Sequence, residues 1–163
     1  MNQSDLHIRL AEPRDLESLV TFNMALAWET EGRQLDRALL RSGVESILAD
    51  SAKGFYVVME HLPTGQTIGQ LLITFEWSDW RNAVFWWLQS VYVQKEWRRR
   101  GVFRQLYDYV LREGERQGNV AGIRLYVEQH NTVAQGVYAH VGLSAAPYKV
   151  FENDFILPTR PSE

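Results

Sequence analysis

Residues 90–111 read SVYVQKEWRRRGVFRQLYDYVL, and this stretch joins a strand to a helix. Its first four residues close an apolar, aromatic run that begins at Val84 and is typical of a buried strand. From Val102 onward, apolar residues recur at the spacing of an amphipathic helix. Residues 94–101 therefore connect the end of a buried strand to the start of a helix.

This connection carries three consecutive arginines followed by a glycine: Arg98, Arg99, Arg100 and Gly101. The first N–H groups of a helix have no partner within the helix, and its dipole is positive at this end. Three further positive charges are unfavourable there unless an anion binds. A phosphate would pair with the arginines and the free N–H groups, and the glycine would let it approach the backbone. The alternative is a set of solvated arginines beside an ordinary turn glycine.

The spacing of Arg98, Gly101 and Phe103 resembles the Arg/Gln-x-x-Gly-x-Gly/Ala loop of the GNAT N-acetyltransferase superfamily, which holds the pyrophosphate of acetyl-CoA. It is neither a nucleotide P-loop, which needs Gly-Lys-Ser/Thr, nor a dinucleotide fingerprint, which needs more glycines. Phe103 stands where the family has Gly or Ala, so its side chain is expected to point into the core. The resemblance assigns cofactor contacts to Arg98, Arg99, Arg100, Gly101, Val102, Phe103 and Arg104.

Composition narrows the class of protein. A chain of 163 residues fits one domain spanning 1–163. The absence of cysteine excludes thiol nucleophiles and Cys-ligated zinc, and the four histidines show no metal spacing, so no metal is expected. A net charge of -3 argues against nucleic acid as a partner. Because no signal peptide or membrane-length apolar run is visible, the sequence predicts a cytoplasmic, soluble protein with no membrane partner.

Periodicity and turn residues predict the order of elements along the chain. The expected elements are a strand at 7–11, helices at 13–32 and 36–50, a hairpin of 55–59 and 67–75, a loop at 76–83, a strand at 84–93, a helix from 102, a break at 118–122, a strand at 123–127, a helix at 131–141, one or two closing strands at 148–156 and a tail. This mixture of a hairpin with crossover units predicts an α/β fold with one mixed, mostly antiparallel sheet flanked by helices. The same order is that of the GNAT fold.

A second stretch extends the resemblance. Residues 125–143 read LYVEQHNTVAQGVYAHVGL, similar to the family's second core motif, in which Asn and Tyr seven residues apart precede a Gly-Leu or Gly-Phe turn. Asn131, Tyr138 and Gly142 fill these positions. The two motifs cover roughly the C-terminal half, while the N-terminal half agrees in element order only. The resemblance implies acetyl-CoA as co-substrate, with Asn131 hydrogen-bonded to its pantetheine arm. Asn131 is otherwise a plain helix cap.

Acetyl transfer to an amine needs a neutral nucleophile, stabilisation of the thioester oxygen and a proton for the leaving thiolate. Tyr138 is the candidate acid, because a phenol (pKa about 10) can protonate a thiolate (about 8.5) without a large mismatch. The alternative is a tyrosine that packs its ring on an amphipathic helix. In the family, the strand before the loop bends away and leaves backbone groups for the thioester and pantetheine. By position these belong to Val91, Tyr92 and Val93, whose side chains are also ordinary core residues.

The general base is not evident. Related enzymes often have Glu or Asp on the strand before the loop, but this sequence has Gln89 and Ser90 there. Glu76 or Glu29 could act through water, or the acceptor could need little help.

The sequence therefore predicts an acetyl-CoA-dependent N-acetyltransferase. It would act on the primary amine of a small, cationic acceptor by direct attack in a ternary complex. A CoA-binding module or sensor without efficient turnover is the alternative, favoured by Phe103 and the missing carboxylate. The acceptor is expected between the loop at 28–35 and residues 76–83, which together carry Glu29, Glu31, Glu76, Asp79, Trp28, Trp77 and Trp80. The acceptor's identity, the acyl-chain preference and the choice between monomer and homodimer stay open.

Overall fold

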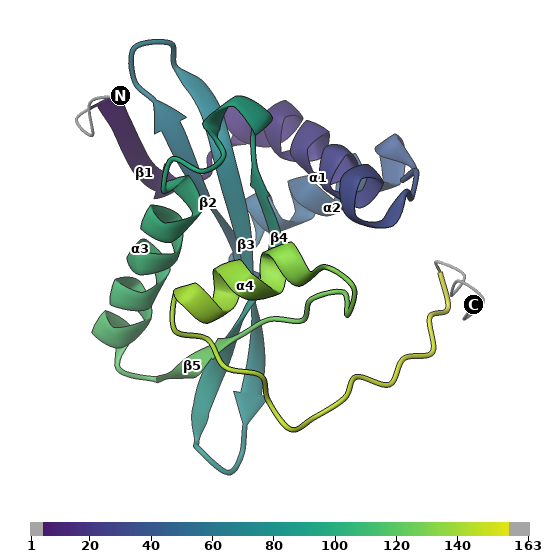
Figure 1. The fold of residues 1–163 in the computed structure, drawn as a ribbon, viewed down its shortest axis with the longest axis vertical. Coiled ribbons are helices and arrows are strands. Elements are labelled where there is room, and N and C mark those ends of the chain that lie inside the picture. Colours follow the sequence, from purple (N-terminus) through teal and green to yellow (C-terminus); the bar gives the residue numbers. More distant parts are fainter. Residues whose placement is uncertain (1–4, 157–163) are drawn as a thin grey trace.

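The computed structural model describes residues 5–156 and is built on a five-stranded sheet in the order β1-β2-β3-β4-β5 (Figure 1). The strands are β1 (Leu6–Leu10), β2 (Phe55–His61), β3 (Gln66–Ser78), β4 (Ala83–Val93) and β5 (Val120–Arg124). The first four pair antiparallel, and β5 runs parallel to β4. The sheet is therefore mixed and mostly antiparallel, as predicted.

Helices cover both faces of this sheet. They are α1 (Leu16–Glu31), α2 (Arg37–Ala49), α3 (Val102–Gln117) and α4 (Thr132–His140). Leu19 and Val20 of α1 are buried with Leu72 of β3, whereas Leu106 and Val110 of α3 are buried on the other face. Two apolar layers thus form on either side of one sheet, because side chains alternate between its faces. None of these helices, in the part of the chain described, is long and apolar enough to cross a membrane.

Polar caps set the helix ends near the predicted places. The Asp36 carboxylate accepts hydrogen bonds from the backbone N–H groups of Ala38 and Leu39, at 2.8 and 3.0 Å, and so starts α2. Gly32 takes a left-handed conformation, with φ of 58°, and ends α1.

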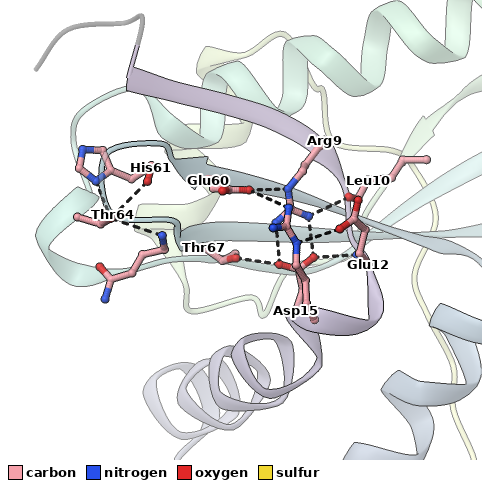
Figure 2. Close-up of polar contacts among 10 residues, drawn as sticks. Arg9, Leu10, Glu12, Asp15, Glu60, His61, Thr64 and Thr67 are labelled. Atoms are coloured by element: carbon pink, nitrogen blue, oxygen red, sulfur yellow. Dashed lines mark hydrogen bonds and ion pairs between the residues drawn. The ribbon is translucent and has the colours of Figure 1, made fainter.

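An ionic cluster anchors the start of α1 to the sheet (Figure 2). Arg9 of β1 lies 2.7 Å from the Asp15 carboxylate and 2.6 Å from that of Glu60 on β2. The Thr67 hydroxyl of β3 donates to Asp15 at 3.1 Å. Burial alone would raise the pKa of Asp15, but the hydrogen bonds from Arg9, the Glu12 backbone and Thr67 hold it below its ordinary value. Asp15 is therefore a buried carboxylate that ties the start of α1 directly to β1 and β3, and through Arg9 to β2.

Four predictions of local structure are wrong. The loop expected at 28–35 starts only at Gly32, because α1 continues to Glu31. Residues 76–83 are not all loop, because Ser78 pairs with Ala83 and only 79–82 make the turn of a long hairpin. The strand predicted at 123–127 begins at Val120 and ends at Arg124, because parallel pairing with β4 starts where Val84 meets Val120. Residues 148–156 form no strand and expose their apolar side chains. The predicted tail, residues 158–163, lies outside the described residues.

Candidate active site

A β-bulge interrupts β4 shortly before the arginine loop. Leu72 pairs with Gln89 and Gln70 pairs with Tyr92, so a single residue of β3 lies opposite both Ser90 and Val91. Ser90 has a φ of 49°, a conformation that is uncommon for residues other than glycine. On the other side, the described pairing of β5 with β4 reaches only to Trp87. The last third of β4 therefore diverges from β5.

The loop after β4 delivers one arginine to this divergence. The Arg98 Nε donates to the carbonyl of Val93 at 2.9 Å, which turns the side chain back along the strand. Gly101 caps the start of α3 with a φ of 77°, and a Cβ added there would meet only the Gln105 side chain, at 4.0 Å. The N-terminus of α3 is thus open to a ligand on the side where Gly101 lacks a side chain.

A pocket of about 240 Å³ lies where β4, the loop, α1 and α4 meet. Its lining residues are Leu26, Glu29, Thr30, Val91, Tyr92, Val93, Arg98, Phe103, Asn131, Ala134, Val137 and Tyr138. Of the predicted residues, the fold therefore brings together the β4 segment, Arg98, Phe103, Asn131, Tyr138 and Glu29. Leu26 and Thr30 are additions that only the packing of α1 reveals.

The aromatic and amide groups of the pocket come from α3 and α4. The Asn131 side chain accepts from the backbone N–H of Ala134 at 3.1 Å and so caps α4, which leaves its NH₂ group available. The Tyr138 ring meets Phe103 edge-on at 5.6 Å, and burial raises the pKa of its phenol. Phe103 packs against the α3 side of the core while its ring borders the pocket.

Glu29 at the C-terminal end of α1 faces Arg98 across the pocket. Their side chains form an ion pair of 2.7 Å, and the Tyr92 hydroxyl donates to the same carboxylate at 3.1 Å. Lys95 lies 3.6 Å away. Burial alone would raise the pKa of Glu29, but the hydrogen bonds from Arg98 and Tyr92 hold it below its ordinary value. Glu29 is therefore ionised near neutral pH and a weak base.

The remaining arginines of the loop have other surroundings. The Arg100 guanidinium lies over the Trp97 ring at 5.4 Å, and Arg104 forms an ion pair of 3.6 Å with Asp108 one turn along α3. Arg99 is exposed, with a φ of 61°. The structure thus places Arg98 in the pocket and these three at its surface margin.

Glu76 lies outside the pocket, on the outer part of β3. It forms an ion pair of 2.7 Å with Arg124 and accepts a hydrogen bond from the Trp87 indole. In Figure 1 the β3–β4 turn forms the lower end of the molecule, whereas the α1–α2 connection lies at the right. The two loops expected to flank the acceptor are therefore well separated.

Three buried polar side chains beside the bulge were not predicted from the sequence. They are Gln70 of β3, Tyr56 of β2 and Asn23 of α1, buried between the sheet and α1. The available signal was a glutamine within the apolar run of 68–73.

The family model of the acetyltransferase (GNAT) family matches residues 15–143, which include the bulged strand, the arginine loop and α4. The chain belongs to this family. No curated protein sequence matches it significantly. Among solved structures, this GNAT protein is similar to a possible acetyltransferase from Clostridium difficile 630, at 40% identity and a TM-score of 0.86, covering 93% of this chain and 99% of that one.

Two more distant structures share the fold of this GNAT protein. One is a predicted acetyltransferase with acetyl-CoA from Clostridium acetobutylicum, at 18% identity and a TM-score of 0.75, covering 91% of this chain and 96% of the other. The second is AAC(6')-Iy in complex with the bisubstrate analog CoA-S-monomethyl-acetylneamine. It has 20% identity and a TM-score of 0.71, with 91% and 97% of the chains covered.

Proposed function

We propose that this GNAT acetyltransferase is a single-domain, cytoplasmic enzyme that transfers acetyl from acetyl-CoA to a primary amine of a small, cationic acceptor. The observation that carries the proposal is the pocket itself. Backbone groups of a bulged strand, the Arg98 guanidinium, the Asn131 amide and the Tyr138 phenol border one space although they come from distant parts of the chain.

Acetyl-CoA fits the groups present. Arg98 and the N–H groups at the start of α3 supply positive charge for the diphosphate, with Arg99, Arg100 and Arg104 at the margin and Val102 and Phe103 in the first turn. The diverging part of β4, from Val91 to Val93, offers backbone groups to the pantetheine arm and thioester. Asn131 has an NH₂ group to donate there as well. The open space above Gly101 agrees with the close approach of a phosphate.

The transfer proceeds by direct attack in the ternary complex. The amine nitrogen forms a bond to the thioester carbon, the C–S bond breaks, and the thiolate takes a proton from Tyr138. The amine's extra proton passes to solvent or to a carboxylate through water. Because the raised pKa keeps Tyr138 protonated, it remains a donor into the alkaline range. Activity should therefore rise with pH from neutral to alkaline values as the amine loses its own proton.

Glu29 is proposed to attract the cationic acceptor. Its carboxylate borders the pocket and stays ionised, which suits binding of an ammonium group better than removal of a proton. The complex of AAC(6')-Iy with a CoA-acetylneamine analog supports an amine-bearing acceptor in a protein of this fold. Glu76, held by Arg124, would act only through water or by its charge.

The alternative, a CoA-binding module or sensor without efficient turnover, is favoured by one observation. Within residues 5–156, the lining of this pocket holds a single carboxylate, Glu29, and its pKa is lowered. Such a module would bind acetyl-CoA but release no thiol when amines are added.

A kinetic assay tests this proposal. Wild type and Glu29→Gln are each incubated with acetyl-CoA and a panel of primary amines, and the release of free CoA thiol is measured. We expect turnover with cationic amines, and a KM for the amine roughly fivefold to tenfold higher in the variant, as for loss of one ion pair. The KM for acetyl-CoA should change less. Glu31→Gln, an exposed neighbour, is the matched control. Turnover restricted to anionic acceptors would contradict the role of Glu29. So would a KM for the amine that is the same in wild type and Glu29→Gln.

A homodimer is part of the proposal. Residues 148–156 expose Tyr148, Val150, Phe151, Phe155 and Ile156, and α4 exposes Val133. Exposed apolar and aromatic side chains concentrated in one segment are typical of an interaction site. A second copy of the chain is the partner we propose for it.

A further inference from the structure

Gln70 is a fully buried amide with a single described partner. Its side chain is 0% exposed, and its Nε2 donates to the carbonyl oxygen of Ser90 at 3.1 Å. Its Oε1 is buried and has no hydrogen-bond partner in the described part of the chain. Burial of an unpaired polar atom is costly, and an apolar side chain of the same shape would avoid that cost. Among the described residues, the hydrogen bond that the Gln70 side chain does make is with the bulge.

The bulge residue Ser90 lies beside a second buried polar pair. Burial raises the pKa of the Tyr56 phenol, and the neighbouring Ser90 side chain acts in the opposite direction; the phenol accepts a hydrogen bond from the Asn23 amide at 3.1 Å. The carbonyl of Ser90 is therefore bound from β3, and its side chain lies beside Tyr56 of β2, which is hydrogen-bonded to α1. These contacts support a backbone conformation that serine otherwise rarely adopts.

The contact with Gln70 orients the next amide. In a trans peptide, the carbonyl of one residue and the N–H of the next point in opposite directions. Because Gln70 reaches the Ser90 carbonyl from β3, the N–H of Val91 points away from β3. That is the side where β5 has diverged and where Val91 borders the pocket.

We infer that Gln70 is a positioning residue, which turns the Val91 N–H toward the thioester oxygen of bound acetyl-CoA. This inference rests on the proposed function. An N–H aimed at that oxygen stabilises the negative charge that develops as the amine attacks, and it needs no reorganisation during the reaction. This role explains why a glutamine with an unpaired Oε1 is present at this position. Its Nε2 group is needed to hold the Ser90 carbonyl, and the unpaired Oε1 is the accompanying cost.

The test uses Gln70→Met, which keeps the length of the side chain and removes its donor. Acetyl-CoA labelled with ¹³C at the carbonyl is added without an acceptor, and its resonance is compared between free and bound states. In wild type, binding should move the resonance downfield, because a hydrogen bond polarises the carbonyl. In Gln70→Met, the bound resonance should return toward the free value while the Kd stays within about threefold. Thiol release should fall roughly 10-fold to 100-fold.

Protein stability separates positioning from a structural role. The melting temperature of Gln70→Met should be unchanged or higher, because the variant also removes the orphaned Oε1. Val44→Ala, which leaves a cavity in the same apolar layer away from the bulge, is the matched control. It should lower the melting temperature and leave the bound resonance unchanged.

Gln70→Glu provides a second arm that does not depend on how the methionine variant folds. A protonated carboxyl can donate to the Ser90 carbonyl, whereas a carboxylate repels it, and burial raises the pKa of such a group. The wild-type shift should therefore appear at low pH and vanish on titration between about pH 6 and 8. Tyr56 and Tyr92, with raised pKa values, and Glu29, with a lowered one, keep their charge in this range.

The outcomes are distinct. If wild type shows the shift and both variants keep it at every pH, Gln70 does not position the amide. If wild type binds acetyl-CoA without any shift, the bulge does not polarise the thioester and the inference fails. If wild type does not bind acetyl-CoA at all, the proposed function itself is wrong.

Discussion

Arg98 is already held in place by three neighbours before any ligand arrives. The Val93 carbonyl, the Glu29 carboxylate and the Tyr92 ring fix its guanidinium at the mouth of the pocket. A diphosphate would meet a preorganised arginine, but it would also compete with Glu29 for it. The affinity for acetyl-CoA is thus set by the difference between two ion pairs, which reduces the net effect of Arg98.

Arg98→Ala should weaken acetyl-CoA binding by about 1.5 kcal/mol, the lower end of the usual contribution of a charge-assisted hydrogen bond, because the competition with Glu29 reduces the net effect. Calorimetry with acetyl-CoA measures the change. Arg112→Ala, which removes an equal charge from an exposed position on α3, should leave the affinity nearly unchanged. Equal affinities in wild type and Arg98→Ala would place the diphosphate elsewhere.

Tyr138→Phe keeps the ring that packs on Phe103 and removes the proton donor. We expect kcat to fall roughly 100-fold or more, with little change in the Kd for acetyl-CoA, because the hydroxyl acts on the leaving thiolate. Steady-state thiol release and calorimetry measure the two quantities. Tyr109→Phe, a partly buried tyrosine of α3, is the control. An unchanged kcat with chemistry rate-limiting would mean that the thiolate takes its proton from water.

Among the elements, α1 couples the two ends of the site. Its start is bound to the sheet by Asp15, its middle carries Asn23 behind the bulge, and its last turn carries Glu29 in the pocket. A shift of α1 would therefore move the polar support of the bulge and the partner of Arg98 together.

The anchor of α1 gives a pH-dependent prediction. The pKa of Asp15 is lowered by folding, so its contribution to stability is present above its unfolded pKa of about 3.9 and is lost as pH falls through the folded value. Asp15→Asn should lower the free energy of unfolding at neutral pH by about 2 to 4 kcal/mol, because Arg9 loses a charged partner. The wild-type and variant curves should converge below about pH 4 in urea titrations.

Asp50→Asn is the control for this titration, since its ion pair with Lys53 is exposed. It should change stability little at any pH. Parallel pH profiles for wild type and Asp15→Asn would show that the cluster contributes no linked stability.

At the scale of the molecule, the exposed C-terminal segment predicts self-association. Phe151 and Phe155 are both 91% exposed, and the segment that carries them forms no helix or strand. Wild type should sediment as a dimer, and the double variant Phe151→Ser, Phe155→Ser as a monomer, because the apolar area buried between copies is lost. Trp80→Ser removes an equally prominent aromatic at the β3–β4 turn and should stay dimeric. A monomeric wild type at micromolar concentration would contradict the prediction.

The sequence by itself determined the elements whose signals are local. The arginines and Gly101 after an apolar run predicted a strand, a loop and a helix, and Asp36 and Gly32 marked helix ends, because caps and periodicity depend on neighbours within a few residues. The same signals failed at residues 76–83 and 148–156. Strand pairing is decided by the partner strand, and apolar alternation without a partner forms no strand.

Only the tertiary structure decided which side chains share the pocket. It placed Glu29 beside Arg98, 69 positions away in sequence, and left Glu76 with Arg124. It also revealed the role of Gln70. The sequence shows only a glutamine within an apolar run, whereas the structure shows that its amide donates to the Ser90 carbonyl. The physical reason is that ion pairs and buried hydrogen bonds act over a few ångströms of space, and distance in space between remote segments is set by packing and not by sequence order.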